Sequence, residues 1–240
     1  MKTYTPSQQK TKLEKALILA LNLANEEMRV LGPHYAEENL RYVVMTAISN
    51  VTCFGDFPNK NQDGYNLCFE KNYEGNTFKP DIVSLNLRAN GKNHKVNLIN
   101  PLVIELKTDA HITATDNKKK INSKLPKDIQ KIKKMGSCLS TDIYKVRQYL
   151  KRENEFHFDF GVVMTIGMPK PQKRDRTDDD RAKYTFDLEV VLKKHQKEFR
   201  KETNSSKNLL FAWYNRLTNK PELIWLDQEQ DIKLQGYVFT

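Results

Sequence analysis

Apolar residues in the first fifty positions recur with the period of an α-helix. Residues 9–31 repeat apolar side chains three or four positions apart and predict an amphipathic helix that ends at Gly32 and Pro33. A second stripe predicts another helix from about residue 35 to 50. The two stripes consist of Leu13, Leu17, Ala20 or Leu21 and Ala24, and of Leu40, Val44, Ala47 and Ile48.

The period changes between residues 51 and 107. The segments "YNLCFE", "FKPDIVSLNL" and "KVNLINPLVIELK" alternate polar and apolar residues or run apolar, as β-strands do. They are separated by "KNYEGN" and "ANGKN", which carry the glycine and asparagine typical of turns. We therefore expect a meander of three strands after the two helices.

The rest of the chain returns to helices and strands. A helix opened by Pro126 is predicted to end at Gly136, and another to begin near Ser140 or Thr141. Mixed charges and two prolines predict a mobile loop at 169–183. The remaining predicted elements are a buried strand at 158–167, a helix at 187–202, and strands at "NLLFAWYNR" and "PELIWLD".

This order predicts a single α/β domain over residues 1–240, built on a mixed central sheet flanked by helices. Its core, helix, three strands, helix and strand, spans about 34–167. The helix at 9–31 and the segment 184–240 are additions to that core. With 38% hydrophobic residues, the 240-residue chain has enough apolar material for one sizeable interior.

The net charge indicates which binding partners to expect, and the cysteine content indicates the cellular compartment. Forty Lys and Arg against 30 Asp and Glu give a net charge of +10, which favours polyanionic partners such as nucleic acid; a basic protein without such a partner is the alternative. Three cysteines without a C-x-x-C pair argue against a disulfide scaffold or a four-thiolate metal site and favour the cytoplasm. The apolar run "ALILALNLA" lacks a cleavage site and continues with helical periodicity, so we expect a core helix and no membrane partner.

Candidate chemistry lies at the ends of two predicted strands. In "LVIELKTD", residues 102–109, an apolar run leads directly into Glu105. Lys107 follows two positions later. Residues i and i+2 of a strand project from the same face, so this carboxylate and this ammonium should point to one place. Asp81 follows Pro80 at the start of the preceding predicted strand. Carboxylates from adjacent strands can share one hard divalent cation, which phosphodiester hydrolysis uses to neutralise charge and to activate water.

The segments "KPDIV" and "IELK", in this order of elements, resemble the PD-(D/E)xK nuclease superfamily, which has the restriction-endonuclease-like fold. The resemblance covers about residues 34–167. It implies that Asp81, Glu105 and the carbonyl of Leu106 bind Mg²⁺ or Mn²⁺, and that Lys107 holds or helps deprotonate the attacking water. Each motif alone has another explanation, because Pro-Asp commonly marks a turn and E-x-K is often a solvated charge pair.

Two further groups are candidates for the same site. Glu37 on the predicted second helix would extend the metal site, with Glu38 as the alternative and an ordinary helix-start charge as the other explanation. Lys127, Lys131 and Lys134 recur on one face of the helix opened by Pro126 and would contact phosphates, or else form a solvated surface. The five histidines form no catalytic pattern, and we assign them no chemistry.

The resulting hypothesis is a metal-dependent nuclease that hydrolyses phosphodiester bonds of DNA, in restriction, defence or a mobile element. The enzyme would be a Mg²⁺-dependent endodeoxyribonuclease, as a homodimer or in a larger defence complex. The main alternative is a nucleic-acid-binding module of the same fold that is inactive alone or acts only within a larger complex. A basic scaffold without a nucleic-acid role is a third hypothesis, which retention on a heparin or DNA column would exclude.

Overall fold

The structure is a computed structural model of the 240-residue chain. It describes residues 5–50, 65–69, 79–86, 99–108, 138–151, 157–166, 178–203 and 206–234, together with residues 127, 130, 131 and 134. The helices are α1 (Pro6–Leu31), η1 (Gly32–His34), α2 (Glu37–Ser49), α4 (Leu139–Lys151) and α5 (Asp178–Glu202). The strands are β1 (Tyr65–Phe69), β2 (Ile82–Asn86), β3 (Ile99–Lys107), β4 (His157–Thr165), β5 (Asn208–Asn215) and β6 (Lys220–Trp225).

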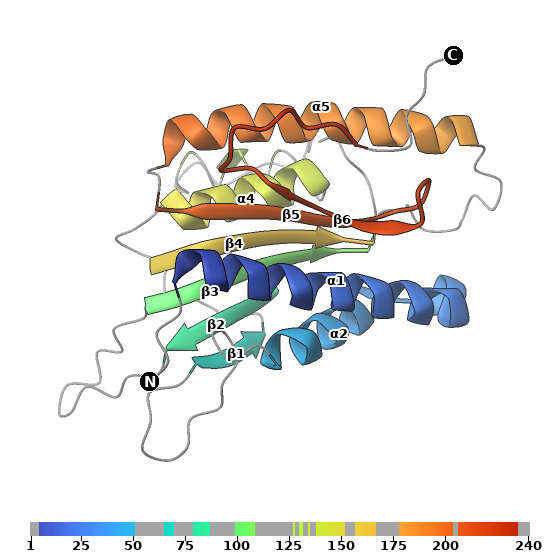
Figure 1. The fold of residues 1–240 in the computed structure, drawn as a ribbon, viewed down its shortest axis with the longest axis horizontal. Helices are drawn as coiled ribbons and strands as arrows, with labels where there is room; N and C mark the ends of the chain where they lie inside the picture. Colours follow the sequence, from blue (N-terminus) through green and yellow to red (C-terminus); the bar gives the residue numbers. More distant parts are fainter. Residues whose placement is uncertain are drawn as a thin grey trace.

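The six strands form one mixed sheet in the order β1-β2-β3-β4-β5-β6 (Figure 1). The three N-terminal strands pair antiparallel, as the predicted meander requires. β3, β4 and β5 are parallel neighbours, and β6 returns antiparallel on β5. Parallel neighbours need a long crossover, and the segments that contain α4 and α5 provide it. The prediction of an α/β fold with a mixed sheet flanked by helices is confirmed.

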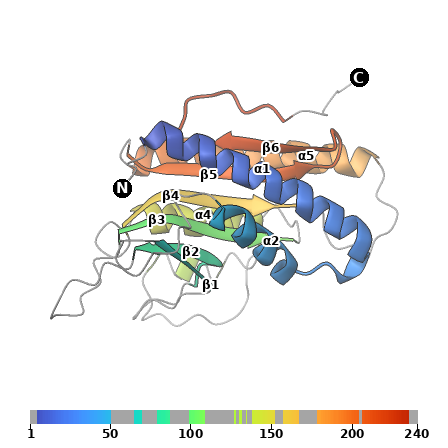
Figure 2. The ribbon, with the colours of Figure 1, turned by 60° about the horizontal axis from the view of Figure 1, so that its bottom comes forward.

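Helices cover both faces of this sheet. One hydrophobic core joins the sheet to α1 and α2, and a second joins its opposite face to α4 and α5. Figures 1 and 2 show α1 and α2 together on one side of the strands. All eight residues of β5, an inner strand of the sheet, are buried, as expected for a strand with helices on both faces.

Successive residues of β3 alternate between these two cores. Leu102, Ile104 and Leu106 pack with α1 and α2, whereas Val103 packs with α4. The period-2 alternation therefore directs the next residue in the Val103 series, Glu105, towards α4.

A close approach of β4 to α4 sets the position of that helix. A Cβ added at Gly161 would lie 2.8 Å from Cδ1 of Leu150 and still closer to Cγ1 of Val146. Real Cβ atoms do not come this near to other carbons, so α4 can rest at this distance from the sheet because residue 161 has no side chain.

Two element boundaries differ from the sequence prediction. α1 begins at Pro6 because Thr5 and Gln8 form a capping box: the N–H of Gln8 donates to Thr5 Oγ1 at 3.3 Å, and the N–H of Thr5 donates to Gln8 Oε1 at 2.9 Å. α5 begins at Asp178, so the predicted loop at 169–183 is wrong from residue 178 onwards. The sequence at 178–180 is three aspartates, a residue type found at helix starts as well as in loops. Residues 169–177 of the predicted loop lie outside the described part of the chain.

No helix in the described part of the chain combines the length and apolar character needed to cross a membrane.

Candidate active site

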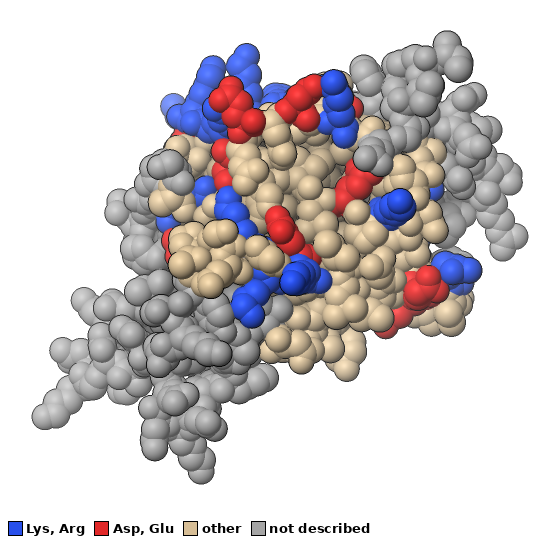
Figure 3. All heavy atoms as spheres, in the orientation of Figure 1, with Lys and Arg blue, Asp and Glu red and all other residues tan. Residues whose placement is uncertain are grey.

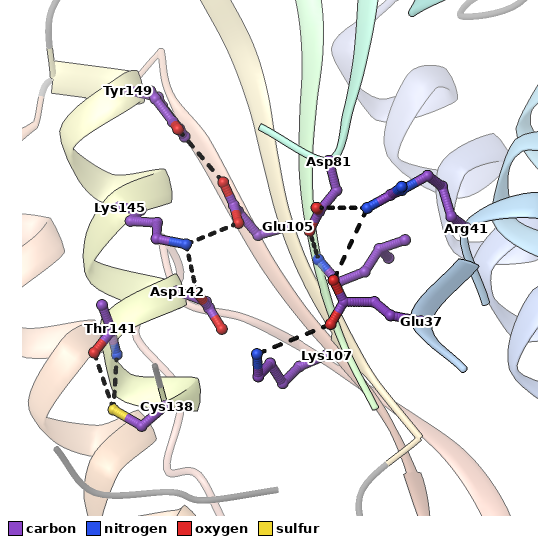
Figure 4. Close-up of polar contacts among 11 residues, drawn as sticks. Glu37, Arg41, Asp81, Glu105, Lys107, Cys138, Thr141, Asp142, Lys145 and Tyr149 are labelled. Carbon is purple, nitrogen blue, oxygen red and sulfur yellow. Dashed lines mark hydrogen bonds and ion pairs between the residues drawn. The ribbon is translucent and has the colours of Figure 1, made fainter. Parts of the chain in front are cut away.

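The pairing of β2 with β3 brings Asp81 next to Glu105. Ile82 lies opposite Ile104, so Asp81, one residue before Ile82, falls beside the residue that follows Ile104. The backbone N–H of Leu106 donates a hydrogen bond to Asp81 Oδ2 at 2.7 Å, which holds this carboxylate against the end of β3 (Figure 4). The structure thus places Asp81 and the Glu105–Lys107 segment together, as the sequence predicted.

Glu105 and Lys107 have different partners, although both lie at the same strand end. Glu105 is 3% exposed and points towards α4, where Tyr149 Oη donates to its Oε1 at 3.4 Å. Lys107 Nζ lies 3.9 Å from Oε2 of Glu37 on α2. The side chain of Leu106 is buried in the core on the α1 and α2 side.

α2 contributes an acid and a base. Glu37 is the first residue of this helix, and Arg41 follows one turn later. Arg41 Nη2 donates to Asp81 Oδ1 at 3.1 Å and lies 3.9 Å from Glu37 Oε1. Glu38 is exposed. Of the two first-helix acids that the sequence left open, Glu37 is therefore the one that faces Asp81 and Lys107.

α4 adds three polar residues that the sequence analysis did not select. Lys145 Nζ donates to Asp142 Oδ1 at 2.8 Å and to Glu105 Oε2 at 3.2 Å, and Tyr149 is the third. Asp142, Lys145 and Tyr149 follow the spacing i, i+3, i+7, which places them on one side of a helix. This spacing was a usable signal, but only the packing of α4 on the sheet shows that this side faces Glu105.

The acidic side chains of the cluster are buried or, in the case of Glu37 and Asp81, partly buried. Burial raises the pKa of Glu37, and the neighbouring Asp81 raises it further. Burial also raises the pKa of Asp81, against the opposing effects of the Leu106 N–H and Arg41. Burial raises the pKa of Glu105 to about 8, with Lys145 opposing and Asp81 adding to the shift. Desolvation disfavours a carboxylate unless a cation lies close by.

Three basic side chains face these acids. Burial alone would lower the pKa of Lys145, but the charges of Glu105 and Asp142 raise it above its ordinary value. Four carboxylates and three cationic side chains make up the cluster, so its net charge is −1 when all are ionised. Its members are Glu37, Asp81, Glu105 and Asp142, and Arg41, Lys107 and Lys145.

The donor chemistry of this cluster fits a hard divalent cation. Carboxylate oxygens are the ligands that Mg²⁺ and Mn²⁺ prefer, and Oδ2 of Asp142 is buried with no hydrogen-bond partner among the described residues. Among the described residues, however, no three His, Cys, Asp or Glu side chains already stand in a metal-holding arrangement. Instead, the carboxylates form ion pairs with the basic side chains. Asp81, Glu105 and Asp142 could bind a cation once Lys145 or Arg41 releases them.

The predicted basic face is exposed where the structure describes it. Lys127, Lys131 and Lys134 are helical, and their side chains are exposed. Lys131 Nζ lies 4.7 Å from the centroid of the Tyr144 ring on α4, so this lysine also makes a cation–π contact within the protein. The apolar stripe expected on the opposite side, Ile129 and Ile132, falls outside the described residues.

A serine and a histidine also meet between α4 and α5. Ser140 Oγ lies 2.9 Å from His195 Nε2, and Arg147 Nη1 donates to His195 Nδ1 at 2.9 Å. Burial and the charge of Arg147 lower the pKa of His195 to about 3, so the ring is neutral. With Nδ1 accepting from Arg147, the ring proton is on Nε2 and is donated to Ser140. His195 therefore cannot take a proton from Ser140, and this contact is structural.

Comparisons with known proteins add no assignment: no family model, no curated protein and no solved structure matches the chain.

Proposed function

We propose that this protein is a metal-dependent nuclease that hydrolyses phosphodiester bonds of DNA, with a core of the restriction-endonuclease-like type. The observation that carries the proposal is the hydrogen bond from the Leu106 N–H to Asp81. It joins the aspartate of "KPDIV" to the middle of "IELK", so the two motifs found separately in the sequence lie next to each other, as one site would require. The order α2, β1, β2, β3, α4, β4 agrees with the order that the resemblance implies.

Asp81 and Glu105 are the proposed ligands of Mg²⁺ or Mn²⁺, with the carbonyl of Leu106 and the carboxylate of Glu37 as further candidates. The bound cation would neutralise charge on the scissile phosphate and favour ionisation of water. Lys107 is placed at the same strand end, where its ammonium would hold the attacking water or offset the negative charge that develops on the phosphate. Glu37, 3.9 Å from Lys107, would orient that ammonium in the absence of DNA.

DNA is the proposed substrate because of charge. A chain with a net charge of +10 attracts polyanions over long distances. On the face shown in Figure 3, basic and acidic side chains are interspersed among the described residues and form no basic stripe. The proposed phosphate contacts are the exposed Lys127, Lys131 and Lys134, which follow β3 in the chain.

A second candidate function is a nucleic-acid-binding module of the same fold that does not cut by itself. The position of Lys145 favours it, because this ammonium occupies Glu105 and Asp142, which a cation would need. In such a module the carboxylates would stabilise the fold through their ion pairs. The cutting subunit would be a partner in a larger complex.

One set of incubations separates these functions. Full-length protein is incubated with supercoiled plasmid and with linear single strands, in Mg²⁺ or Mn²⁺ and in EDTA. We expect nicking or linearisation in the metal ions, none in EDTA, and none with Asp81→Asn or Lys107→Gln. Glu38→Gln is the matched control, since it removes an exposed acid next to Glu37 and should cut normally.

Binding to the same DNA, measured by gel shift, is needed to interpret a negative result. DNA binding without cleavage in any metal ion would refute the nuclease and favour the binding module. Cleavage that persists in EDTA would refute the role assigned to the cation. Failure to bind DNA, together with no retention on a heparin column, would refute both functions.

A further inference from the structure

We propose that Asp142 is an additional ligand of the divalent cation and that Lys145 is its built-in substitute, occupying the carboxylates when no cation is bound. This inference rests on the proposed function, because it assumes that the cluster at the end of β3 binds a cation. It adds a ligand from α4, which neither sequence motif contains. In this proposal Lys145 also competes with the metal ion for the carboxylates of Glu105 and Asp142.

The orphaned oxygen of Asp142 is the first observation. Asp142 is 3% exposed, and its two carboxylate oxygens have different environments. Oδ1 accepts from Lys145 at 2.8 Å, whereas Oδ2 is fully buried and has no hydrogen-bond partner among the described residues. Buried carboxylate oxygens are normally satisfied by donors or by cations. In Figure 4, Asp142 points from α4 towards the strand end where Glu105 and Lys107 lie.

The bridging position of Lys145 is the second observation. Its single ammonium lies 2.8 Å from Asp142 and 3.2 Å from Glu105, so it links the helix to the strand. One ammonium faces two carboxyl groups there, with Asp81 close enough to affect Glu105 electrostatically. A divalent cation would balance two carboxylates, and its oxygen ligands would include the orphaned Oδ2. A lysine side chain is long and flexible, so it can leave the carboxylates without any movement of α4.

A purely structural ion pair is the competing explanation, and it makes different predictions. In that case Lys145 would tie α4 to β3, and its loss would leave buried carboxylates without a partner and lower stability. Binding of a cation would not improve when Lys145 is removed. If Lys145 competes with the cation, its loss should instead create a better site, since the same carboxylates become available.

The test is calorimetric titration of Mn²⁺ into chelator-treated, full-length protein at one pH. The variants are Asp142→Asn, Lys145→Gln and Asp81→Asn. Lys193→Gln is the matched control, because Lys193 also pairs with a carboxylate one turn away, Glu189 at 2.7 Å, but on the outer surface of α5. Melting temperatures with and without Mn²⁺ provide a second readout and show whether each variant is folded.

We expect Asp142→Asn to weaken Mn²⁺ binding at least about tenfold, the lower end of the effects measured for groups around metal sites. Lys145→Gln should strengthen binding by about tenfold or more, and Mn²⁺ should raise its melting temperature further than that of the wild type. Lys193→Gln should bind Mn²⁺ as the wild type does. If Asp142→Asn does not fold, the increase in affinity of Lys145→Gln still decides the question.

Unchanged Mn²⁺ affinity in folded Asp142→Asn, or unchanged or weaker affinity in Lys145→Gln, would overturn this inference. If Mn²⁺ binding to the wild type is then still lost in Asp81→Asn, the proposed function stands without it. If neither the wild type nor Lys145→Gln binds Mn²⁺, the cation assigned under the proposed function is refuted together with this inference.

Discussion

Replacing Gly161 by alanine tests how closely the site depends on the packing of α4. Glycine within a strand normally weakens it, so an unhindered Gly→Ala change would stabilise the protein by about 0.4–1 kcal/mol. Here the new Cβ would lie 2.8 Å from Leu150 Cδ1 and nearer still to Val146 Cγ1. Both side chains are fully buried on α4, and forcing an extra carbon into such a core costs about 1–3 kcal/mol.

We therefore expect Gly161→Ala to lower the free energy of unfolding by about 1–2 kcal/mol, since the overpacking cost exceeds the gain from removing the glycine. The assay is equilibrium unfolding in urea, followed by circular dichroism. Val146→Ala provides the partner for a double-mutant cycle, because it removes the methyl groups nearest to the added carbon. The double variant should be more stable than the sum of the two single changes predicts, by about 1 kcal/mol or more.

The sign of the effect makes this prediction decisive. A stabilising Gly161→Ala change, or additive effects in the cycle, would refute the close approach of β4 to α4. Because Asp142 and Lys145 lie on α4, the variant should also weaken Mn²⁺ binding, whereas Val146→Ala in the same background should partly restore it.

Three other predictions concern charge and cations. In EDTA, the stability of Glu105→Gln relative to the wild type should rise as the pH increases from about 4.5 to about 8. The reason is that the Glu105 carboxyl of the unfolded wild type loses its proton near its ordinary pKa of 4.5, whereas the folded protein keeps that proton up to a pKa of about 8. The wild type therefore loses stability over this pH range, and the glutamine variant does not. Thermal melts at pH 5 and pH 8 measure this difference, and an equal difference at both values would contradict the burial of Glu105. Replacing Lys127, Lys131 and Lys134 together by glutamine should make the slope of log K against log salt shallower by up to roughly 2–3 units and weaken binding to all DNA sequences alike; an unchanged slope would assign these lysines to the solvent. Calcium should support DNA binding with little cleavage, because its larger and looser coordination shell positions water poorly; gel shift and plasmid nicking in parallel would detect full cleavage in Ca²⁺, which would argue against the assigned cation chemistry.

Much of the fold could be predicted from local pattern. The apolar stripes that predicted helices at 9–31 and 35–50 correspond to α1 and α2, and the alternation around "VIELK" corresponds to β3. These predictions succeed because helix and strand periods are properties of short segments whose apolar face must be buried. The predicted starts of α1 and α5 were wrong, because apolar periodicity shows neither the capping box at Thr5 nor that a charged run is helical from Asp178.

The site likewise contains residues that the sequence could identify and residues that it could not. Asp81, Glu105 and Lys107 could be selected from the sequence, because each stands at a fixed position relative to a predicted strand, and antiparallel pairing of adjacent strands brings them together. Lys145 and Asp142 could not, although their spacing on a helix was visible. Which side of α4 faces Glu105 depends on how the helix rests on the sheet, and Gly161 contributes to that from another strand.

Tertiary structure alone decided the partners of the remaining charged groups. Arg41 meets Asp81 across 40 residues, and Ser140 meets His195 across 55. The contact between Ser140 and His195 resembles a catalytic pair, but the hydrogen bond from Arg147 fixes the tautomer in which His195 cannot accept a proton from Ser140. Local sequence determines which side chains an element presents on each face, because that depends on backbone geometry over a few residues. The neighbours that those side chains meet are determined by the packing of distant segments around a shared core, where burial and pairing of charge depend on the whole fold.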